Sequence, residues 1–227
     1  MRFIKNISKF SMIYISRQKT WHIGYKMVKY GSSVILASGS PRRIDMLREA
    51  GICPRVLIPE VEEAVRLPLE PQQLVMCLAL KKALAAEEQL CLEGADMSRS
   101  LLIAADTVVY AGTVLGKPAS EKEAMEMLRF LNGRTHWVYS GVCLMGTPDR
   151  IRRVFYCVTG VKFIDYGEED IRSYVATGES MDKAGAYAIQ GGFSPYVERV
   201  AGPRDNVIGF PLGMILEELH ALGISLE

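Results

Sequence analysis

The chain has 227 residues, of which 49% are hydrophobic and 23% are charged, enough to bury a substantial core in one domain. Its longest central apolar run, Leu74–Leu80, is far shorter than the roughly 20 residues that span a bilayer, so we expect a protein that does not enter the membrane. The formal net charge of +1 conceals an asymmetry, because the first 30 residues hold seven basic side chains and no acidic one.

The rest of the chain holds 20 basic and 26 acidic side chains. A net-negative body argues against binding along the phosphate backbone of DNA or RNA. It favours instead a small phosphate ligand that is held by a few placed cations.

Residues 1–30 are predicted to be a basic extension, and residues 31–227 a single domain. The first 26 residues lack the compact apolar stretch and small-residue cleavage site of a secretory signal. A basic, acid-free segment would suit an organellar transit peptide in a eukaryote, but we favour a functional chain that starts near Met27. The five cysteines and three histidines show no zinc-binding or redox spacing, so we expect buried, reduced thiols and a cytoplasmic location.

The first half of the domain alternates strands and helices. The predicted elements are a buried strand at Ser33–Ala37, a helix at Pro41–Ala50, a strand at Arg55–Pro59 and a long helix from Pro71 to about Leu92. Ser40 is the expected N-cap of the first helix, and Gly51 follows its end. The Leu74–Leu80 segment is apolar all round, so we expect it to be buried.

The second half contains more strands. The predicted elements are a buried strand at Leu101–Ala105, a hairpin of Val108–Tyr110 and Thr113–Leu115, a helix from Ser120 to Leu131, two long strands around Gly146–Asp149, a helix at Glu168–Thr177, and a last strand followed by a helix from about Pro211 to Leu222. Ser120 and Glu123 have the spacing of a capping box. Hairpins and strand–helix–strand units together predict an α/β fold with a mixed β-sheet flanked by helices.

The segment Ala37-Ser38-Gly39-Ser40-Pro41-Arg42-Arg43 leaves a predicted strand and enters a helix. Glycine lets the backbone approach a ligand closely, and the free N–H groups of a helix start favour an anion. The serine hydroxyls and the guanidinium groups are donors that suit phosphate oxygens. An ordinary strand–helix connection explains the pattern equally well, because it is not the Gly-x-x-x-x-Gly-Lys-Ser/Thr phosphate loop.

Asp106 directly follows a predicted buried strand. In open α/β sheets, ligands bind beyond the carboxyl ends of strands, where a carboxylate can hold a divalent metal, deprotonate water, or do both. A solvent-facing aspartate that caps a turn is the alternative. Lys117 follows a hairpin strand and can return toward the same edge, although a lone loop lysine is usually only solvated.

Two charged pairs and one loop stay open to two interpretations. Glu62-Glu63 is either surface charge or part of a site, and one lysine of Lys81-Lys82 either reaches solvent or points into a cleft. The segment 182–192 contains glycines at 185, 191 and 192, and among them small residues, a charge pair, Tyr187 and Gln190. It is either a tight structural loop or a backbone that packs on a flat ligand, where glutamine can pair with both donor and acceptor edges of a base.

In identity, order and spacing, these segments resemble the Maf family of nucleoside triphosphate pyrophosphatases over roughly Ser33–Leu219. The matching segments are Ala-Ser-Gly-Ser-Pro-Arg-Arg at 37–43, Glu62-Glu63, Ala105-Asp106-Thr107, Gly116-Lys117-Pro118 and Asp182–Gly191. The last is similar to the branch that acts on dTTP and UTP. The resemblance implies a single α/β domain with a substrate cleft, similar to the inosine triphosphatase fold.

The resemblance also implies an activity, namely the hydrolysis of dTTP and UTP, and of modified pyrimidine nucleotides, to the monophosphate and pyrophosphate. Asp106 would accept the proton of the attacking water. The other implied roles are base selection by Arg42, Thr107 and Gln190; phosphate binding by Ser38, Ser40, Arg43, Lys82 and Lys117; and metal binding by Glu62, Glu63, Asp106 and Asp182. The implied cofactor is Mg²⁺ or Mn²⁺, and the implied assembly is a homodimer.

Two alternatives remain open at this stage. One is a house-cleaning pyrophosphatase of the inosine triphosphate type, against which the Ser-Pro-Arg-Arg and Ile-Gln-Gly segments argue. The other is a nucleotide-binding regulator of cell division with little turnover. Asp106, Lys82 and Lys117 favour an enzyme, because a binding module needs no base.

Overall fold

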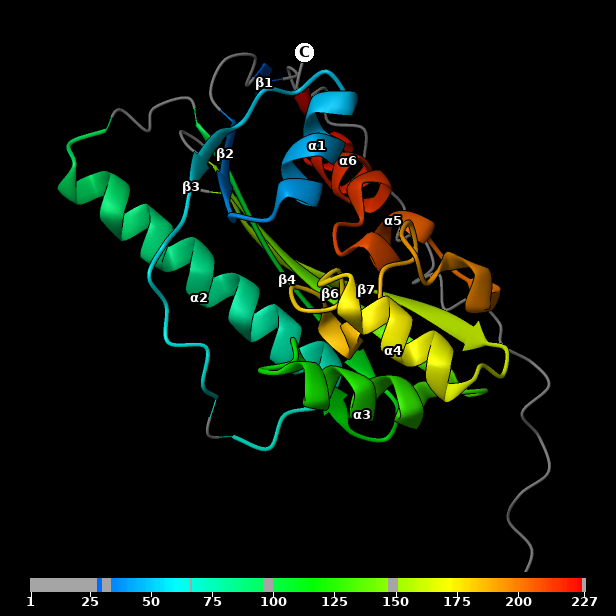
Figure 1. Ribbon diagram of the computed structural model, residues 1–227. Coiled ribbons are helices and arrows are strands. Elements are labelled where there is room, and N and C mark those ends of the chain that lie inside the picture. Colours follow the sequence, from blue (N-terminus) through cyan, green and yellow to red (C-terminus); the bar gives the residue numbers. More distant parts are fainter. Residues whose placement is uncertain (1–27, 30–33, 66, 96–99, 147–150, 226–227) are drawn as a thin grey trace, which may run out of the picture.

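A mixed β-sheet organises the domain (Figure 1). The computed structural model describes residues 28–29, 34–65, 67–95, 100–146 and 151–225, so all of the predicted extension 1–30 except residues 28–29 lies outside the described residues. In the described part of the chain, seven strands form this sheet in the order β3-β2-β4-β6-β7-β8, with β5 paired to β4. β1 (Val28–Lys29) and β9 (Ile224–Ser225) pair with each other in parallel.

The predicted α/β fold with a mixed sheet is confirmed. The sheet strands are β2 (Val34–Ala37), β3 (Arg55–Leu57), β4 (Leu101–Tyr110), β5 (Val114–Leu115), β6 (Thr135–Gly146), β7 (Ile151–Phe163) and β8 (Val197–Ala201). The α-helices are α1 (Pro41–Glu49), α2 (Pro71–Leu92), α3 (Glu121–Leu131), α4 (Glu168–Ala176), α5 (Arg204–Ile208) and α6 (Leu212–Ala221). Short 3₁₀ turns, η1 (Ala184–Ala186) and η2 (Ser194–Tyr196), lie between α4 and β8.

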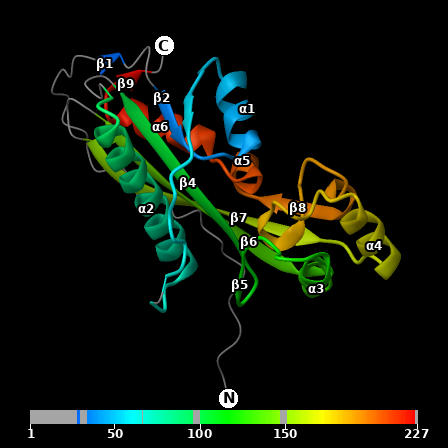
Figure 2. The same cartoon turned by 60° about the vertical axis from the view of Figure 1, so that its left-hand side comes forward.

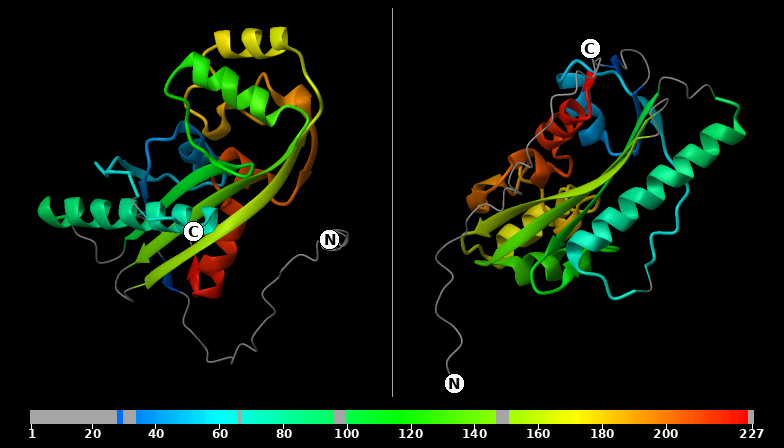
Figure 3. Two further views of the ribbon diagram at one scale, coloured as in Figure 1. Left: turned by 90° about the horizontal axis from the view of Figure 1, so that it is seen from below. Right: turned by 180° about the vertical axis from the view of Figure 1, so that it is seen from behind.

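Helices cover both faces of the sheet (Figure 2). The helix α2 lies along one face, where its small residues pack on side chains such as Leu102 and Cys143. The other face carries two separate apolar clusters. One contains residues of α1 and α6 around Leu36 and Ile103, and the other contains residues of α3 and α4 around Val138 and Phe163. Figure 3 shows α3 and α4 together, away from α1 and α6.

Most predicted helices match the observed bounds because their ends carry strong local features. Pro41 and Pro71 stand at the first turns of α1 and α2, and the Ser120 hydroxyl accepts a hydrogen bond from the Glu123 amide at the start of α3. Ser40 occupies the N-cap position of α1, as predicted, but its side chain makes no capping hydrogen bond.

Several predictions about strands and burial were wrong. The predicted strand at 101–105 and the first arm of the hairpin are one strand, β4, because β6 is long enough to pair with all of it. The segment Leu74–Leu80 is only partly buried, since α2 packs on the sheet with one side. Helix α5 and strand β9 were not predicted. The five cysteines are free, but only Cys143 and Cys157 are buried. No described helix is long and apolar enough to cross a membrane.

Backbone contact at Gly141 sets how closely α2 approaches the sheet. A Cβ atom on Gly141 would lie 2.3 Å from the carbonyl carbon and oxygen of Val75. Because backbone atoms of a packed helix cannot step aside, Gly141→Ala should lower the free energy of unfolding by about 1–3 kcal/mol, measured by urea denaturation.

Gly160 provides the control on the adjacent strand β7. A Cβ atom there would find its nearest neighbours at 3.8 Å, an ordinary contact distance. Gly160→Ala should therefore leave the stability unchanged or raise it slightly. Equal losses for the two substitutions would contradict this account of the helix–sheet contact.

Candidate active site

A cleft of about 940 Å³ opens where the edge of β4 is left without a neighbouring strand. Within the described chain, β2 pairs with β4 only as far as Ile103, and β5 pairs from Val109 onward. Between these points β2 has ended, because the chain turns at Ser38–Ser40 into the proline that starts α1. The cleft walls come from this turn, the segment after β3, α2, β4, the loop 182–190 and the end of α5.

Asp106 lies in the middle of this open edge. We expected it just after the end of a strand, but it lies inside β4, opposite Gly141 of β6. The expected position beyond the end of its own strand was therefore wrong; the strand that ends at this point is the neighbouring β2. The side chain is largely enclosed, since Asp106 is 8% exposed.

Lys82 joins two carboxylates at the cleft. Its Nζ donates to Asp106 Oδ1 at 2.6 Å and lies 2.7 Å from Glu63 Oε1. The ambiguity within the lysine pair is thereby resolved, because Lys81 donates instead to the backbone carbonyl of Glu62. The hydrogen bond from Lys82 lowers the pKa of Glu63, so that this carboxylate stays ionised near neutral pH.

Arg43 lines the cleft, is partly buried, and links the end of β2, the middle of β4 and the end of α5. Its Nε donates to the Gly209 carbonyl at 3.0 Å, and its Nη1 donates to the Ala105 carbonyl at 2.6 Å and to Ser38 Oγ at 3.1 Å. Its Nη2 donates to Thr107 Oγ1. These bonds engage four of the five N–H donors of a guanidinium. Burial lowers the pKa of Arg43, and nearby Asp106 opposes that effect. Its expected contact with phosphate stays a prediction; its described role is structural.

The hydroxyl groups near Arg43 join the same network. Ser38 Oγ also accepts a hydrogen bond from the Ser40 amide. Thr107 Oγ1 lies 2.9 Å from Ser140 Oγ and donates to the Gly209 carbonyl. The structure thus places the Thr107 hydroxyl among protein partners at the cleft wall, and its predicted part in base selection is not tested.

The other side of the cleft is closed by an ion pair between α1 and the loop 182–190. Arg42 Nη1 donates to Asp182 Oδ2 at 2.9 Å, and Lys183 Nζ contacts the other oxygen at 2.7 Å. Burial alone would raise the pKa of Asp182, but the bonds from Lys183 and Arg42 outweigh it and lower the pKa. Asp182 is therefore held by cations rather than brought to the carboxylates at Lys82.

The four expected metal ligands do not gather at one point. Glu63 and Asp106 meet at Lys82, whereas Asp182 faces Arg42 and Glu62 contacts Lys81 through its carbonyl. Among the described residues, no group of three or more His, Cys, Asp or Glu side chains could hold a metal ion. Two carboxylates are the protein ligands that the described geometry offers.

Lys117 and Gln190 both line the cleft, as predicted from their loops. The two loops are linked, because the Gly185 amide donates to the Gly116 carbonyl at 3.0 Å. Sequence analysis missed Ser140 and Gly209, which complete the network around Arg43. Gly209 adopts a left-handed φ of 103° at the end of α5, and its place before Phe210-Pro211 was the one feature that pointed to a sharp turn there.

Comparisons with known proteins identify the family to which the chain is similar. A family model described as "Maf-like protein" matches residues 33–222. A dTTP/UTP pyrophosphatase of Bacillus cereus (strain AH820) is 41% identical over 193 residues, which cover 85% of this chain and 96% of that protein. A dTTP/UTP pyrophosphatase of Dictyoglomus thermophilum is 43% identical over 198 residues, which cover 85% of this chain and 97% of that protein.

The role of Arg43 can be tested by replacing it with lysine. Arg43→Lys keeps the charge but supplies one nitrogen for several acceptors, so that the buried carbonyls of Ala105 and Gly209 each lose a hydrogen bond. We expect the free energy of unfolding to fall by at least about 2 kcal/mol, measured by chemical denaturation.

Arg42→Lys is the matched control on the neighbouring residue. Arg42 makes a partly exposed ion pair, so this exchange should change the stability by less than about 1 kcal/mol. A loss at Arg43 no larger than that at Arg42 would show that the buried network contributes little.

Proposed function

Because the chain belongs to the family of Maf-like proteins, we propose that it is a pyrophosphatase that hydrolyses dTTP and UTP to the nucleoside monophosphate and pyrophosphate. The names of its relatives support this activity. The observation that carries it is the meeting of Asp106, Lys82 and Glu63 at one end of a cleft large enough for a nucleotide.

Asp106 is the general base in this proposal. Its Oδ1 accepts the hydrogen bond of Lys82, so its Oδ2 is the oxygen that we assign to the proton of water. The water attacks as the bridge between the α and β phosphates breaks, and pyrophosphate leaves. Hydrolysis of a phosphoanhydride requires little covalent chemistry from a protein; it requires a base, positioning and neutralised charge.

Cations at the cleft supply part of that charge. Lys82 and Lys117 line the wall near Asp106, and Arg42 stands at the start of α1 across the cleft. Lys82 and Arg42 are paired with carboxylates, and a nucleotide would compete for them. We assign Lys82 and Lys117 to the phosphates, and Arg42 and the exposed amide of Gln190 to the base.

The proposed cofactor is Mg²⁺ or Mn²⁺. Glu63 and Asp106 each direct an oxygen at the same ammonium group, and Mg²⁺ is commonly bound by one or two carboxylates together with substrate phosphates. This donor set fits a divalent cation that is shared with the triphosphate. When bound, the cation would neutralise phosphate charge.

A panel of triphosphates tests the proposal. With Mg²⁺ present, the wild-type protein should release pyrophosphate from UTP and dTTP faster than from CTP, GTP or ITP. Asp106→Asn keeps the shape of the side chain but removes the base, so we expect turnover of UTP to fall at least ~10²-fold while the nucleotide still binds. Near-normal turnover in a folded Asp106→Asn protein would rule out this base, and preference for ITP would favour the other pyrophosphatase class.

The affinity for Mn²⁺ tests whether Glu63 and Asp106 bind the cation. Lys82 holds the position between the two carboxylates, so we expect free Mn²⁺ to bind weakly until a nucleotide draws Lys82 away. Lys82→Met should raise the affinity for Mn²⁺ without nucleotide by about tenfold or more, measured by electron paramagnetic resonance, because the competing ion pairs of a partly buried lysine are worth about 1.4 kcal/mol or more.

Lys81→Met serves as the control for this measurement. Lys81 contacts a backbone carbonyl rather than the two carboxylates, so its removal should leave the Mn²⁺ affinity unchanged. If Lys82→Met binds Mn²⁺ no better than Lys81→Met, the carboxylate pair is not the cation site.

A further inference from the structure

The loop that carries Gln190 is irregular and needs external support. Ala186 adopts a left-handed φ of 61°, which is unfavourable for a residue with a side chain. Gln190 itself is exposed at the cleft. A mobile amide would read a base poorly, because ordering it on binding costs conformational entropy. Selectivity therefore depends on whatever fixes the loop backbone beside Gln190.

Tyr174 of α4 holds the loop before Gln190. The Ala188 amide donates to Tyr174 Oη at 3.0 Å, and Tyr174 is only 4% exposed. Burial, and next to it the charge of the neighbouring Glu179 carboxylate, raise the pKa of the Tyr174 hydroxyl. The hydroxyl thus stays protonated near neutral pH, and its oxygen accepts the hydrogen bond of the loop amide.

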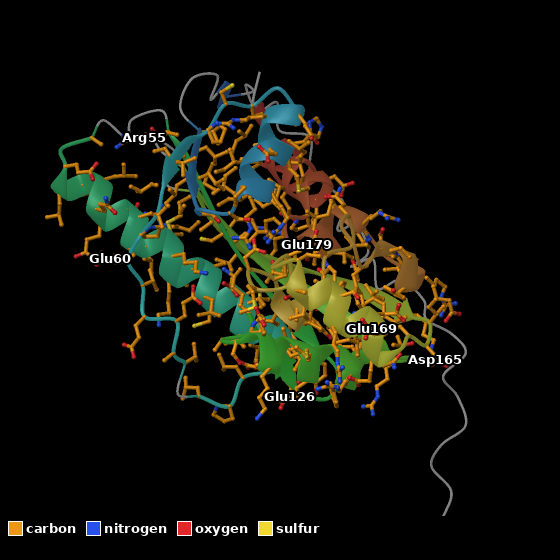
Figure 4. All side chains as sticks on the ribbon, viewed as in Figure 1. Arg55, Glu60, Glu126, Asp165, Glu169 and Glu179 are labelled. Atoms are coloured by element: carbon orange, nitrogen blue, oxygen red, sulfur yellow. The ribbon has the colours of Figure 1, made fainter. Side chains whose placement is uncertain are left out.

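Glu179 holds the loop after Gln190. Its Oε2 accepts a hydrogen bond from the Gly192 amide at 2.9 Å, and its backbone carbonyl accepts one from Lys183 Nζ at 2.6 Å. Figure 4 shows Glu169 and Glu179 at opposite ends of α4, with Glu179 nearer the centre of the molecule.

The glycines of the loop fit this arrangement. A Cβ atom on Gly191 would lie 1.7 Å from Glu179 Oε1, and one on Gly192 would lie 3.2 Å from Tyr174 Cδ2. The close approach at Gly191 and Gly192 is therefore to Glu179 and Tyr174. Tyr174 and Glu179 do not line the cleft, so they act on it through the loop.

We propose that Tyr174 and Glu179 are positioning residues that set base selectivity by fixing the backbone on both sides of Gln190. The inference rests on the proposed function, since it concerns the choice between pyrimidine triphosphates and other nucleotides. It assigns selectivity to side chains that do not contact the substrate.

Two substitutions at Tyr174 and Tyr166 test the proposal. Tyr174→Phe removes the acceptor of the Ala188 amide, so we expect the ratio of kcat/KM for UTP over CTP to fall by about tenfold, the effect of one lost buried hydrogen bond. Tyr166→Phe removes a buried hydroxyl from the same aromatic cluster, where it donates to the Leu128 carbonyl, and should leave that ratio unchanged. Equal ratios in wild type and Tyr174→Phe would overturn the proposal.

Two changes at Glu179 test the second support. Glu179→Gln retains an oxygen that can accept from Gly192 and should keep most of the selectivity, whereas we expect Glu179→Ala to lose it to the same extent as Gln190→Ala, which removes the proposed base-reading amide. A general loss of stability would not produce this order. Equal selectivity in Glu179→Ala and Glu179→Gln would argue against the assignment.

Hydrogen exchange separates this inference from the proposed function. Amide exchange at 188–192 should speed up in Tyr174→Phe and Glu179→Ala but not in Tyr166→Phe, whether or not the protein turns over UTP. If the wild type shows no preference for UTP and dTTP, the proposed function fails, and the exchange comparison alone decides whether α4 holds the loop. Unchanged exchange in Tyr174→Phe would overturn the inference.

Discussion

The hydrogen bonds of the partly buried Arg43 guanidinium are the interaction on which the site depends. It bonds to Ser38 at the end of β2, to Ala105 and Thr107 within β4, and to Gly209 at the end of α5. Backbone hydrogen bonds do not link β2 to β4 beside Asp106, because β2 has ended there and the edge of β4 is open. The guanidinium is planar and carries several donors in fixed directions, so it holds the end of β2, strand β4 and the end of α5 together around the cleft that Asp106 lines.

The two ends of the cleft are built differently. At the Asp106 end, Lys82 and Asp106 stand on the regular elements α2 and β4, and Glu63 stands on the segment after β3. At the Gln190 end, the functional group stands on a loop that is shaped by Tyr174 of α4, by Glu179 beyond the end of α4, and by the Gly185 contact with Gly116. The groups proposed to act on every triphosphate thus lie mainly on a helix and a strand. The group proposed to recognise the base lies on a loop whose conformation is fixed by neighbouring side chains.

Much of the fold was predictable because local rules and tertiary structure agree. Prolines at 41 and 71 and the Ser120 cap mark helix starts that packing preserves. The strand β4 was misjudged because its length depends on β6, a partner some 30 residues away that leaves no trace in the local pattern. The site residues were identified by resemblance, but neither resemblance nor spacing revealed that Arg43 faces protein carbonyls or that Lys82, rather than Lys81, points inward. Such facts arise only when distant segments meet.

The large sequence separation between Arg43 and its hydrogen-bond partners affects the order in which the protein folds during synthesis. Its partners Ala105 and Gly209 lie 62 and 166 residues further along the chain. A chain emerging from the ribosome exposes Arg43 long before Gly209 exists, so the cleft wall cannot close until synthesis has nearly ended. A nascent or C-terminally truncated chain therefore lacks the complete pocket, and stabilisation by bound nucleotide becomes available only to the finished protein.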